Sequence, residues 1–230
     1  MMVRKNIYLS VLLILNVLLL STPTIANAQR RPSLPKVKED SIPFFRGVAV
    51  GVDLVGPAMR WLASYGQYEG MLRVNLKDRY YPVIEVGVGQ ADKTDETTGT
   101  TFKTTAPYGR VGCDFNMLKD KHDVYRFLVG GRVGYTSFKY DVLSPGVLDP
   151  IWGTQSTYGN LGNKGRQLWA ELVGGVDAKI WGPIRMGWSV RYKLRLARKM
   201  SEIGEPWYVP GYGRSGSSQL GATFNVLFEL

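Results

Sequence analysis

One segment of the chain alternates strictly between large apolar residues and charged or small ones. In residues 184–196 every even position is large and apolar, and every odd position is charged or small. Successive side chains of a β-strand point to opposite faces, so the pattern predicts a strand with one apolar and one ionic face. A helix would instead scatter the four cations of this segment around its circumference. The segment is also long enough to cross a bilayer, which takes about 9–11 residues of tilted strand.

The same alternation predicts further strands along the rest of the chain. Their expected ranges are 46–55, 67–77, 80–91, 107–118, 124–138, 167–180 and 219–230. Alternating segments of about ten residues, separated by turns, are the signature of a transmembrane β-barrel. We therefore predict an all-β fold, an eight-stranded antiparallel up-and-down transmembrane β-barrel over residues 46–230.

The connections between these strands alternate in length. Short turns are expected near Asp78, in 119–123 and in 181–183. The longer connections cover 56–66, 92–106, 139–166 and 197–218. Outer-membrane barrels have short turns on the periplasmic side and longer loops outside. The alternation therefore fits an even-stranded barrel with both termini in the periplasm.

The N-terminal residues 1–28 have the features of a cleaved signal peptide. Two cations precede an apolar run over 7–20, and Ala-Asn-Ala at 26–28 fits the small-x-small cleavage pattern. A membrane anchor is the alternative, but a spanning helix needs about 20 apolar residues. Residues 29–45, rich in proline and charge, are expected to form a flexible lead-in to the first strand.

The charge balance narrows the range of partners. Removing the signal peptide takes away Arg4 and Lys5 and no acid, which lowers the net charge from +10 to +8. The remaining cations alternate with apolar residues and form no basic arm, and the chain is expected to be exported. We therefore expect no nucleic-acid partner. Cys113 is the only cysteine, so no intramolecular disulfide is expected.

Alternation alone does not say which face points outward. A soluble lipocalin-like barrel would turn its apolar face inward around a ligand. Loop asymmetry favours the membrane orientation, and so does the last strand, which is apolar at every second position up to Leu230. We therefore expect localisation in the cell outer membrane, with outer-membrane lipid and the insertion machinery as partners. Aromatic girdles at the two membrane interfaces are expected to include Tyr80, Tyr81 and Tyr125 at one end, and Tyr68, Tyr108, Tyr135 and Trp169 at the other.

Two pairs of segments carry a resemblance to known proteins. Residues 127–135 (Phe-Leu-Val-Gly-Gly-Arg-Val-Gly-Tyr) and 224–230 (Phe-Asn-Val-Leu-Phe-Glu-Leu) resemble small outer-membrane β-barrels. Residues 68–76 and 106–114 are similar to an uncharacterised barrel family, a domain of unknown function, of Bacteroides-type bacteria. The resemblance covers nearly the whole mature chain. It implies an outer-membrane barrel and brings no known activity with it.

The sequence offers little to build an enzyme from. His122, the only histidine, falls in an expected turn, and a hydrolytic triad in the barrel wall would need a better-placed base. His122 and Cys113 point different ways, so neither a metal site nor a cofactor is expected. Asp92, Asp95 and Glu96 could contact Ca²⁺, but a charged exposed loop is the simpler interpretation. We expect no enzymatic activity.

The inward row of the barrel is rich in charge. An eight-stranded barrel is just wide enough for side chains to fill it, so these charges are expected to pair as a structural network. The alternative is that the excess of cations favours anions in a narrow pore. If the turn before residue 184 centres on Gly182, Glu171 lies opposite Lys193; a slip of two residues would instead place Arg191 or Arg195 there. The predicted lumen network comprises Asp53, Glu69, Arg73, Glu85, Arg110, Asp114, Arg126, Arg132, Glu171, Asp177, Arg185, Arg191, Lys193 and Arg195.

These patterns favour a non-enzymatic outer-membrane barrel with a structural or surface-interaction role. The alternatives are a narrow anion-permeable channel and a periplasmic lipocalin-like binder of an apolar ligand. The long connection 139–166 holds Trp152 and Tyr158 among glycines, a composition that suits recognition of an extracellular partner. The connection 197–218 is the second candidate for that role.

Overall fold

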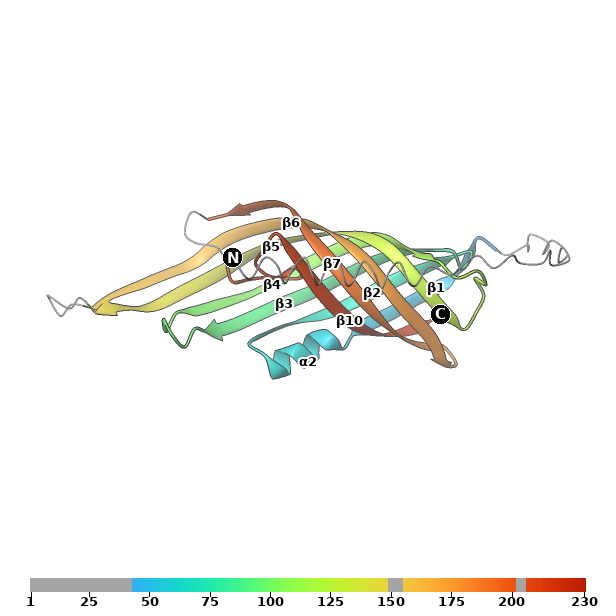
Figure 1. Cartoon of the computed structure of the whole chain (residues 1–230), viewed down its shortest axis with the longest axis horizontal. Helices are drawn as coiled ribbons and strands as arrows, with labels where there is room; N and C mark the ends of the chain where they lie inside the picture. The colour runs from blue at the N-terminus through green and yellow to red at the C-terminus, as the bar shows by residue number, and fades with distance from the viewer. Residues whose placement is uncertain (1–42, 149–154, 202–205) are drawn as a thin grey trace, which may run out of the picture. The chain divides into compact units, whose positions relative to one another are not determined.

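The described residues of the computed structural model are 43–148, 155–201 and 206–230. The predicted signal peptide, most of the predicted lead-in and Trp152 lie outside them. Within the described chain, the strands close into an antiparallel barrel in the order β1-β10-β7-β6-β5-β4-β3-β2 (Figure 1). The predicted eight-stranded antiparallel barrel is confirmed.

The barrel strands match the predicted ranges closely at the short-turn end. They are β1 (Phe45–Asp53), β2 (Tyr65–Leu76), β3 (Tyr80–Thr94), β4 (Thr101–Asn116), β5 (Tyr125–Leu148), β6 (Gln155–Trp181), β7 (Ile184–Met200) and β10 (Ser218–Glu229). The other described elements are the helix α2 (Val55–Leu62) and the two short strands β8 (Tyr208–Val209) and β9 (Gly213–Arg214).

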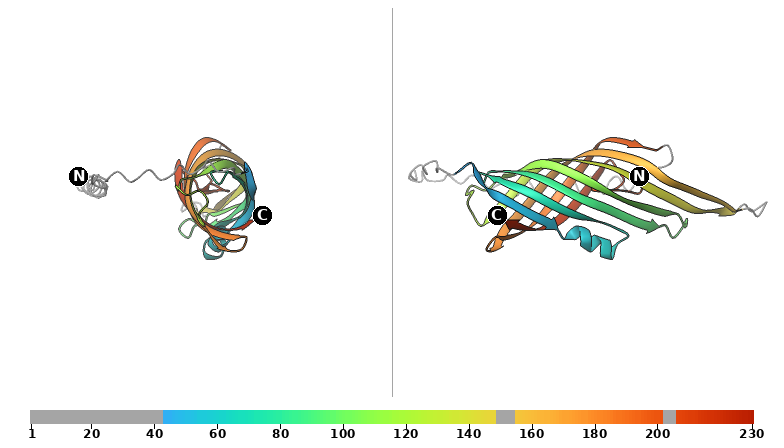
Figure 2. Two further views of the ribbon diagram at one scale, coloured as in Figure 1. Left: turned by 90° about the vertical axis from the view of Figure 1, so that its right-hand side faces the viewer. Right: turned by 180° about the vertical axis from the view of Figure 1, so that it is seen from behind.

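The apolar row of each barrel strand points outward and the polar row points inward. On β7, Val190 is 60% exposed while its neighbour Arg191 is 1% exposed. The same contrast holds on the other strands, for example between Ile84 (52%) and Glu85 (0%) on β3. An apolar lumen is what a lipocalin-like binder requires, so that alternative is wrong. The ring of strands around this polar interior is seen end-on in Figure 2.

The two ends of the barrel differ, as the connection lengths predicted. At one end, connections of three, eight and two residues join β2 to β3, β4 to β5 and β6 to β7. Gly182 adopts the left-handed conformation (φ 53°) that the tight turn between Trp181 and Ile184 requires. The other end carries α2, the β8–β9 hairpin and the extended part of the β5–β6 hairpin. We call these the short-turn end and the long end.

The connection 139–166 is not a loop, which corrects the prediction. The strands β5 and β6 continue to pair through it, as far as Leu148 opposite Gln155. Their neighbours stop earlier: β4 begins opposite Leu143, and β7 ends opposite Gly165. Beyond Tyr135 the large apolar residues move to the inward row, where Phe138 and Tyr140 are buried, so an alternation with an apolar outward face no longer marks this part of the hairpin. The outer part of this hairpin therefore projects beyond the adjacent strands as a two-stranded ribbon (Figure 1).

Two other predicted loops contain structure that the alternation did not indicate. The connection 56–66 forms most of α2, whose start is held by the carboxylate of Asp53. That group accepts hydrogen bonds from the backbone N–H of Val55 (3.1 Å) and Gly56 (2.9 Å), two donors that a helix start leaves free. The connection 197–218 carries the β8–β9 hairpin, which folds back into the barrel.

Candidate functional site: the ion-paired lumen and its plug

The centre of the lumen is organised around Glu85, a fully buried residue of β3. Arg191 Nη1 and Arg110 Nε lie 2.8 Å and 2.9 Å from Glu85 Oε2, and Arg132 pairs with its other carboxylate oxygen. The three guanidinium groups come from β7, β4 and β5. One carboxylate thus connects strands from opposite walls of the barrel.

Glu69 and Glu171 complete this central layer. Arg110 pairs with Glu69, and its Nη1 lies 3.1 Å from Glu171 Oε1. Arg191 lies 3.6 Å from Glu69 and 3.5 Å from Glu171. Acids and bases therefore alternate around the lumen, as a dry interior demands, because an unpaired buried charge costs several kcal/mol.

A second layer lies toward the short-turn end. Arg73 stands between Asp177 (2.8 Å) and Asp114 (3.6 Å), and Arg185 Nη2 lies 2.7 Å from Asp177 Oδ1. Arg132 joins the two layers through a 3.0 Å contact with Asp114. The cavity beside these groups has a volume of about 20 Å³. That is room for about one water molecule.

A third group of charges closes the short-turn end around Asp78, in the β2–β3 turn. Its carboxylate accepts a hydrogen bond from Asn75 Nδ2 (2.6 Å) and lies 2.7 Å from His122 Nδ1 and 3.2 Å from Arg46 Nη1. Burial acts to raise the pKa of Asp78. The hydrogen bonds from Asn75 and His122, together with the nearby guanidinium groups, outweigh burial and hold that pKa below its usual value.

Most of the predicted lumen residues take part in these ion pairs. Arg126 pairs with Glu229 at 2.9 Å, which ties β5 to the last strand. Two predicted residues have other surroundings. Asp53 holds the start of α2 and also accepts the backbone N–H of Phe224 (3.1 Å). Arg195 is half-buried near the long end, where its backbone N–H donates to the carbonyl of Ser217 (3.0 Å).

Part of the predicted aromatic girdle lies inside the barrel. Tyr108 donates a hydrogen bond from its hydroxyl to Glu69 (2.6 Å), and Trp169 donates from Nε1 to Glu171 (2.7 Å). Both side chains are buried, as is Tyr81. The prediction was wrong for these three residues because their positions in the period-2 pattern place them on the inward row.

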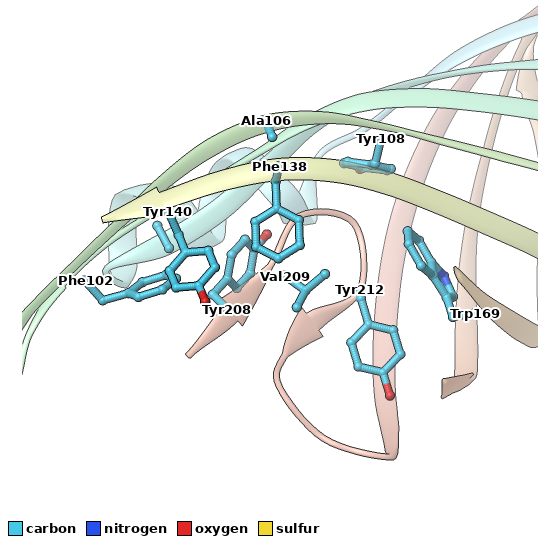
Figure 3. Close-up of a cluster of buried hydrophobic side chains, with 10 residues drawn as sticks. Phe102, Ala106, Tyr108, Phe138, Tyr140, Trp169, Tyr208, Val209 and Tyr212 are labelled. Atoms are coloured by element: carbon cyan, nitrogen blue, oxygen red, sulfur yellow. The ribbon is translucent and has the colours of Figure 1, made fainter. Parts of the chain in front are cut away.

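The long end of the lumen is filled by the β8–β9 segment, residues 206–217, which we call the plug. Tyr208, Val209 and Tyr212 of the plug are buried against aromatic residues of the barrel wall (Figure 3). The ring of Tyr212 lies 5.9 Å from that of Trp169, edge to face. Tyr208 and Tyr212 belong to the connection 197–218, the second candidate for surface recognition, but because both side chains are buried they are not part of an exposed surface.

Lys193 of β7 holds the plug in place. Its ammonium donates hydrogen bonds to the backbone carbonyls of Gly211 (2.7 Å) and Tyr212 (3.1 Å). Gly211 has a left-handed backbone (φ 77°) and packs against the ring of Tyr108, so a larger residue there would collide with that ring. The plug is thus fixed both by a charged hydrogen bond and by close aromatic packing.

A cavity of about 290 Å³ remains beside the plug. It lies between the start of α2, the first residues of β2, the wall strand β7 and the first residues of β10. Its polar side is formed by Arg110, Arg191 and Lys193, and its apolar side includes Met59 and Leu220. The cavity therefore borders the charged central layer at the long end of the lumen.

Sequence reasoning missed several of these features. Arg46 and Asp78 are outside the predicted network because the first begins the predicted strand 46–55 on the row of its apolar residues and the second falls in a predicted turn. The alternation predicts only a long connection over the plug, although the run Tyr-Val-Pro-Gly-Tyr-Gly at 208–213 has the aromatic and turn residues of a packed hairpin. Tyr158 lies on β6 opposite Ser144, within the ribbon.

The loop acids have local partners. Asp95 Oδ1 accepts the backbone N–H of Thr97 (2.9 Å) and Thr98 (3.2 Å), and these hydrogen bonds hold the pKa of Asp95 below its usual value. Asp92 lies 3.3 Å from Lys103 on the next strand. Among the residues in view, no three histidine, cysteine or acidic side chains come together as a metal site would need.

Comparisons with known proteins give one family and one related structure. A family model described as "Domain of unknown function (DUF6048)" matches residues 6–229. No curated protein matches the chain. Among solved structures, the chain is similar to the crystal structure of a major outer membrane protein from Thermus thermophilus, with 12% identity and a TM-score of 0.44, over 80% of this chain and 98% of that one. In the described part of the chain, no helix has the length and apolar character needed to span a membrane.

Proposed function

The chain belongs to the DUF6048 family, and from its geometry we propose that it is a closed barrel of the bacterial outer membrane that displays surface elements and conducts no ions. The observation that carries the proposal is the inverted polarity of the barrel. Its outward rows expose large apolar side chains on strands all around the ring, while its inward rows bury charges. A contiguous apolar surface of this extent is unstable in water and suits lipid.

The lumen supports the closed state. The central and second layers pair their acids and bases at contact distance, and the plug fills the long end above them. An anion entering the lumen would have to separate buried ion pairs, and each broken pair costs about 3–5 kcal/mol. The narrow anion channel is therefore the less favoured alternative.

The orientation follows from the two ends. We infer that the short-turn end faces the periplasm, and that the long end, with α2 and the ribbon of β5 and β6, faces outward. The ribbon is the element that a surface partner would reach first, so we place the surface-interaction role there. This assignment, a signal peptide over residues 1–28 and a place among Bacteroides-type bacteria remain parts of the proposal.

We further propose that the barrel is not an enzyme. His122 and Asp78 form a pair that could orient a general base, but the cavity beside them is lined by no serine, threonine or cysteine among the described residues. A hydrolytic site needs such a nucleophile within hydrogen-bond reach of the histidine.

The proposal is tested by fractionation and conductance. The full chain expressed in a Gram-negative host should enter the outer-membrane fraction and migrate faster on a gel when unboiled than when boiled. In planar bilayers, the purified barrel should give no stable conductance steps. Recovery as a soluble periplasmic protein would contradict membrane insertion, and reproducible anion-selective steps would contradict the closed lumen.

A further inference from the structure

The barrel wall has a gap beside α2. The pairing of β1 with β10 ends at Asp53 opposite Asn225, although β10 begins at Ser218. The pairing of β1 with β2 ends at Val52 opposite Gly70, although β2 begins at Tyr65. The first residues of β2 and β10 therefore extend past β1 with no strand between them. The helix α2 packs against both strands at this place (Figures 1 and 2).

The cavity of about 290 Å³ lies at this gap. Its lining includes Arg191 and Lys193 on the inward row of β7, and Leu220 and Ala222 of β10. Val55 and Met59 of α2 line it as well. The cavity therefore extends from the charged lumen to α2, at the place where β1 no longer pairs with β2 and β10.

The two sides of the cavity differ in chemistry. The outer side is apolar, with Val55 and Met59 of α2 and Leu220 of β10. The inner side presents Lys193, two of whose N–H donors go to plug carbonyls and whose Nζ lies 4.0 Å from Glu171. An ammonium has three donors, and this separation from Glu171 is too long for a hydrogen bond. The inner side therefore offers a cationic donor to an entering acceptor.

Glycine keeps the cavity open. Gly221 of β10 lies directly opposite Arg191, and a Cβ atom there would meet only the Lys193 side chain, at 3.5 Å. A side chain at position 221 would thus fit the backbone but would extend into the cavity. The outer surface beside the gap is apolar as well, since Trp61 and Leu62 of α2 are 93% and 86% exposed.

We propose that this cavity binds a single-chain amphiphile with a carboxylate head, of the fatty-acid class, which enters sideways from the membrane. The carboxylate lies at Lys193, and the alkyl chain leaves through the gap between α2 and β10 and follows the outward apolar row. The volume is at the lower end of the roughly 300–1,000 Å³ of small-ligand pockets, which suits the head and the first carbons of the chain. The entry route rests on the proposed membrane location.

The test uses the purified full chain in phosphatidylcholine nanodiscs and dodecanoic acid labelled with ¹³C at the carboxyl carbon. The wild type should give a saturable bound carboxyl resonance. Gly221→Val should fill the cavity and weaken binding by about tenfold or more, and Lys193→Met should do the same. Gly174→Val is the matched control, because a Cβ at Gly174 on β6 meets no atom within 4 Å. This control should bind as the wild type does.

Several outcomes would overturn the proposal. It is wrong if Gly221→Val binds as tightly as the wild type, or if Gly174→Val loses binding equally. If dodecanol competes as effectively as unlabelled dodecanoate, the site does not recognise the carboxylate, and the proposed head group is wrong. A site that takes diacyl lipid would already be filled by the nanodisc and would show no saturable dodecanoate signal. Gel mobility of unboiled samples verifies the fold of each variant, and fractionation tests the membrane location separately.

Discussion

Glu171 and Lys193 face each other across β6 and β7, yet the lysine binds the plug more closely than it binds the glutamate. The Lys193 Nζ lies 4.0 Å from Glu171 Oε1 but 2.7 Å from the carbonyl oxygen of Gly211. The glutamate in turn lies closer to Arg110, at 3.1 Å. For these two residues, a position directly opposite in the sheet therefore does not give the closest contact.

This arrangement predicts the result of two double-mutant cycles. Glu171→Gln should destabilise the barrel because it leaves Arg110 and Arg191 short of a carboxylate. Lys193→Met removes hydrogen bonds to the plug and is destabilising by itself, but it should cost less in the Glu171→Gln background than in the wild type, with a coupling of about 0.5–1 kcal/mol. The cycle of Glu85→Gln with Arg191→Met should show a larger coupling, because that pair lies at 2.8 Å.

Urea unfolding in detergent or vesicles measures both cycles. The similar volume of each replacement makes the comparison a test of charge, and heat-dependent gel mobility checks that each variant folds. Equal couplings in the two cycles, or strictly additive losses in both, would contradict the pairing described for the central layer.

The charge of Asp78 should make the short-turn end sensitive to acid. Its pKa is lowered in the folded barrel, so its ionised form contributes stability that is complete above the unfolded pKa of about 3.9 and is lost as the pH falls through the folded value. The difference in unfolding free energy between the wild type and Asp78→Asn should therefore be constant near neutral pH and shrink in acid. If this difference in unfolding free energy grows as the pH falls, folding does not lower the pKa of Asp78.

Cys113 should react only with membrane-soluble reagents. It lies on the outward row of β4 between Val111 and Phe115, which are both exposed on the apolar surface. In the membrane-inserted protein, a charged maleimide should fail to label it and a lipid-soluble one should succeed. Thr97→Cys in a Cys113→Ala background places a thiol in an exposed loop and should react with both. Rapid labelling of Cys113 by the charged reagent would contradict the orientation of the strands.

The ribbon should be dispensable for folding and necessary for any surface partner. Leu143 and Gly159 are opposite each other, so replacing residues 144–158 with Asn-Gly would close the hairpin with a two-residue turn. The shortened barrel should insert and keep its gel mobility, while crosslinks to a partner on intact cells should disappear. Failure to fold would make the ribbon a structural element, and unchanged crosslinks would move the recognition role to the rest of the long end.

The sequence predicted the wall of the barrel well because a period of two has a simple structural meaning. Val190 and Arg191 had to face opposite sides, and Glu171 lies opposite Lys193 as predicted, although a register shift between Lys179 and Trp181 contributes to that register. The pattern names the inward row but not the pairs within it. Glu85 meets Arg191 across the lumen because the barrel is closed and its strands are tilted. The alternation of residues encodes neither of these properties.

The features beside the wall escaped prediction for a different reason. The helix α2 is short, and its start depends on the carboxylate of Asp53 at the end of a strand. The plug depends on an ammonium group from β7 and on rings from the wall, so its segment alone resembles any loop rich in glycine and proline. Both features are stabilised by tertiary contacts, which a local pattern does not reveal.

The position of Glu85 has a consequence for how the barrel assembles. Its carboxylate lies on β3, but two of its three guanidinium partners come from β5 and β7, the latter on the far side of the ring. A partly formed sheet of the first strands would hold this acid in lipid without its neutralising bases, at a cost of several kcal/mol. Intermediates of that kind are too unstable to accumulate, so insertion and closure should proceed as one cooperative event. The carboxylate of Glu85 has all of its guanidinium partners only when β7 joins the sheet.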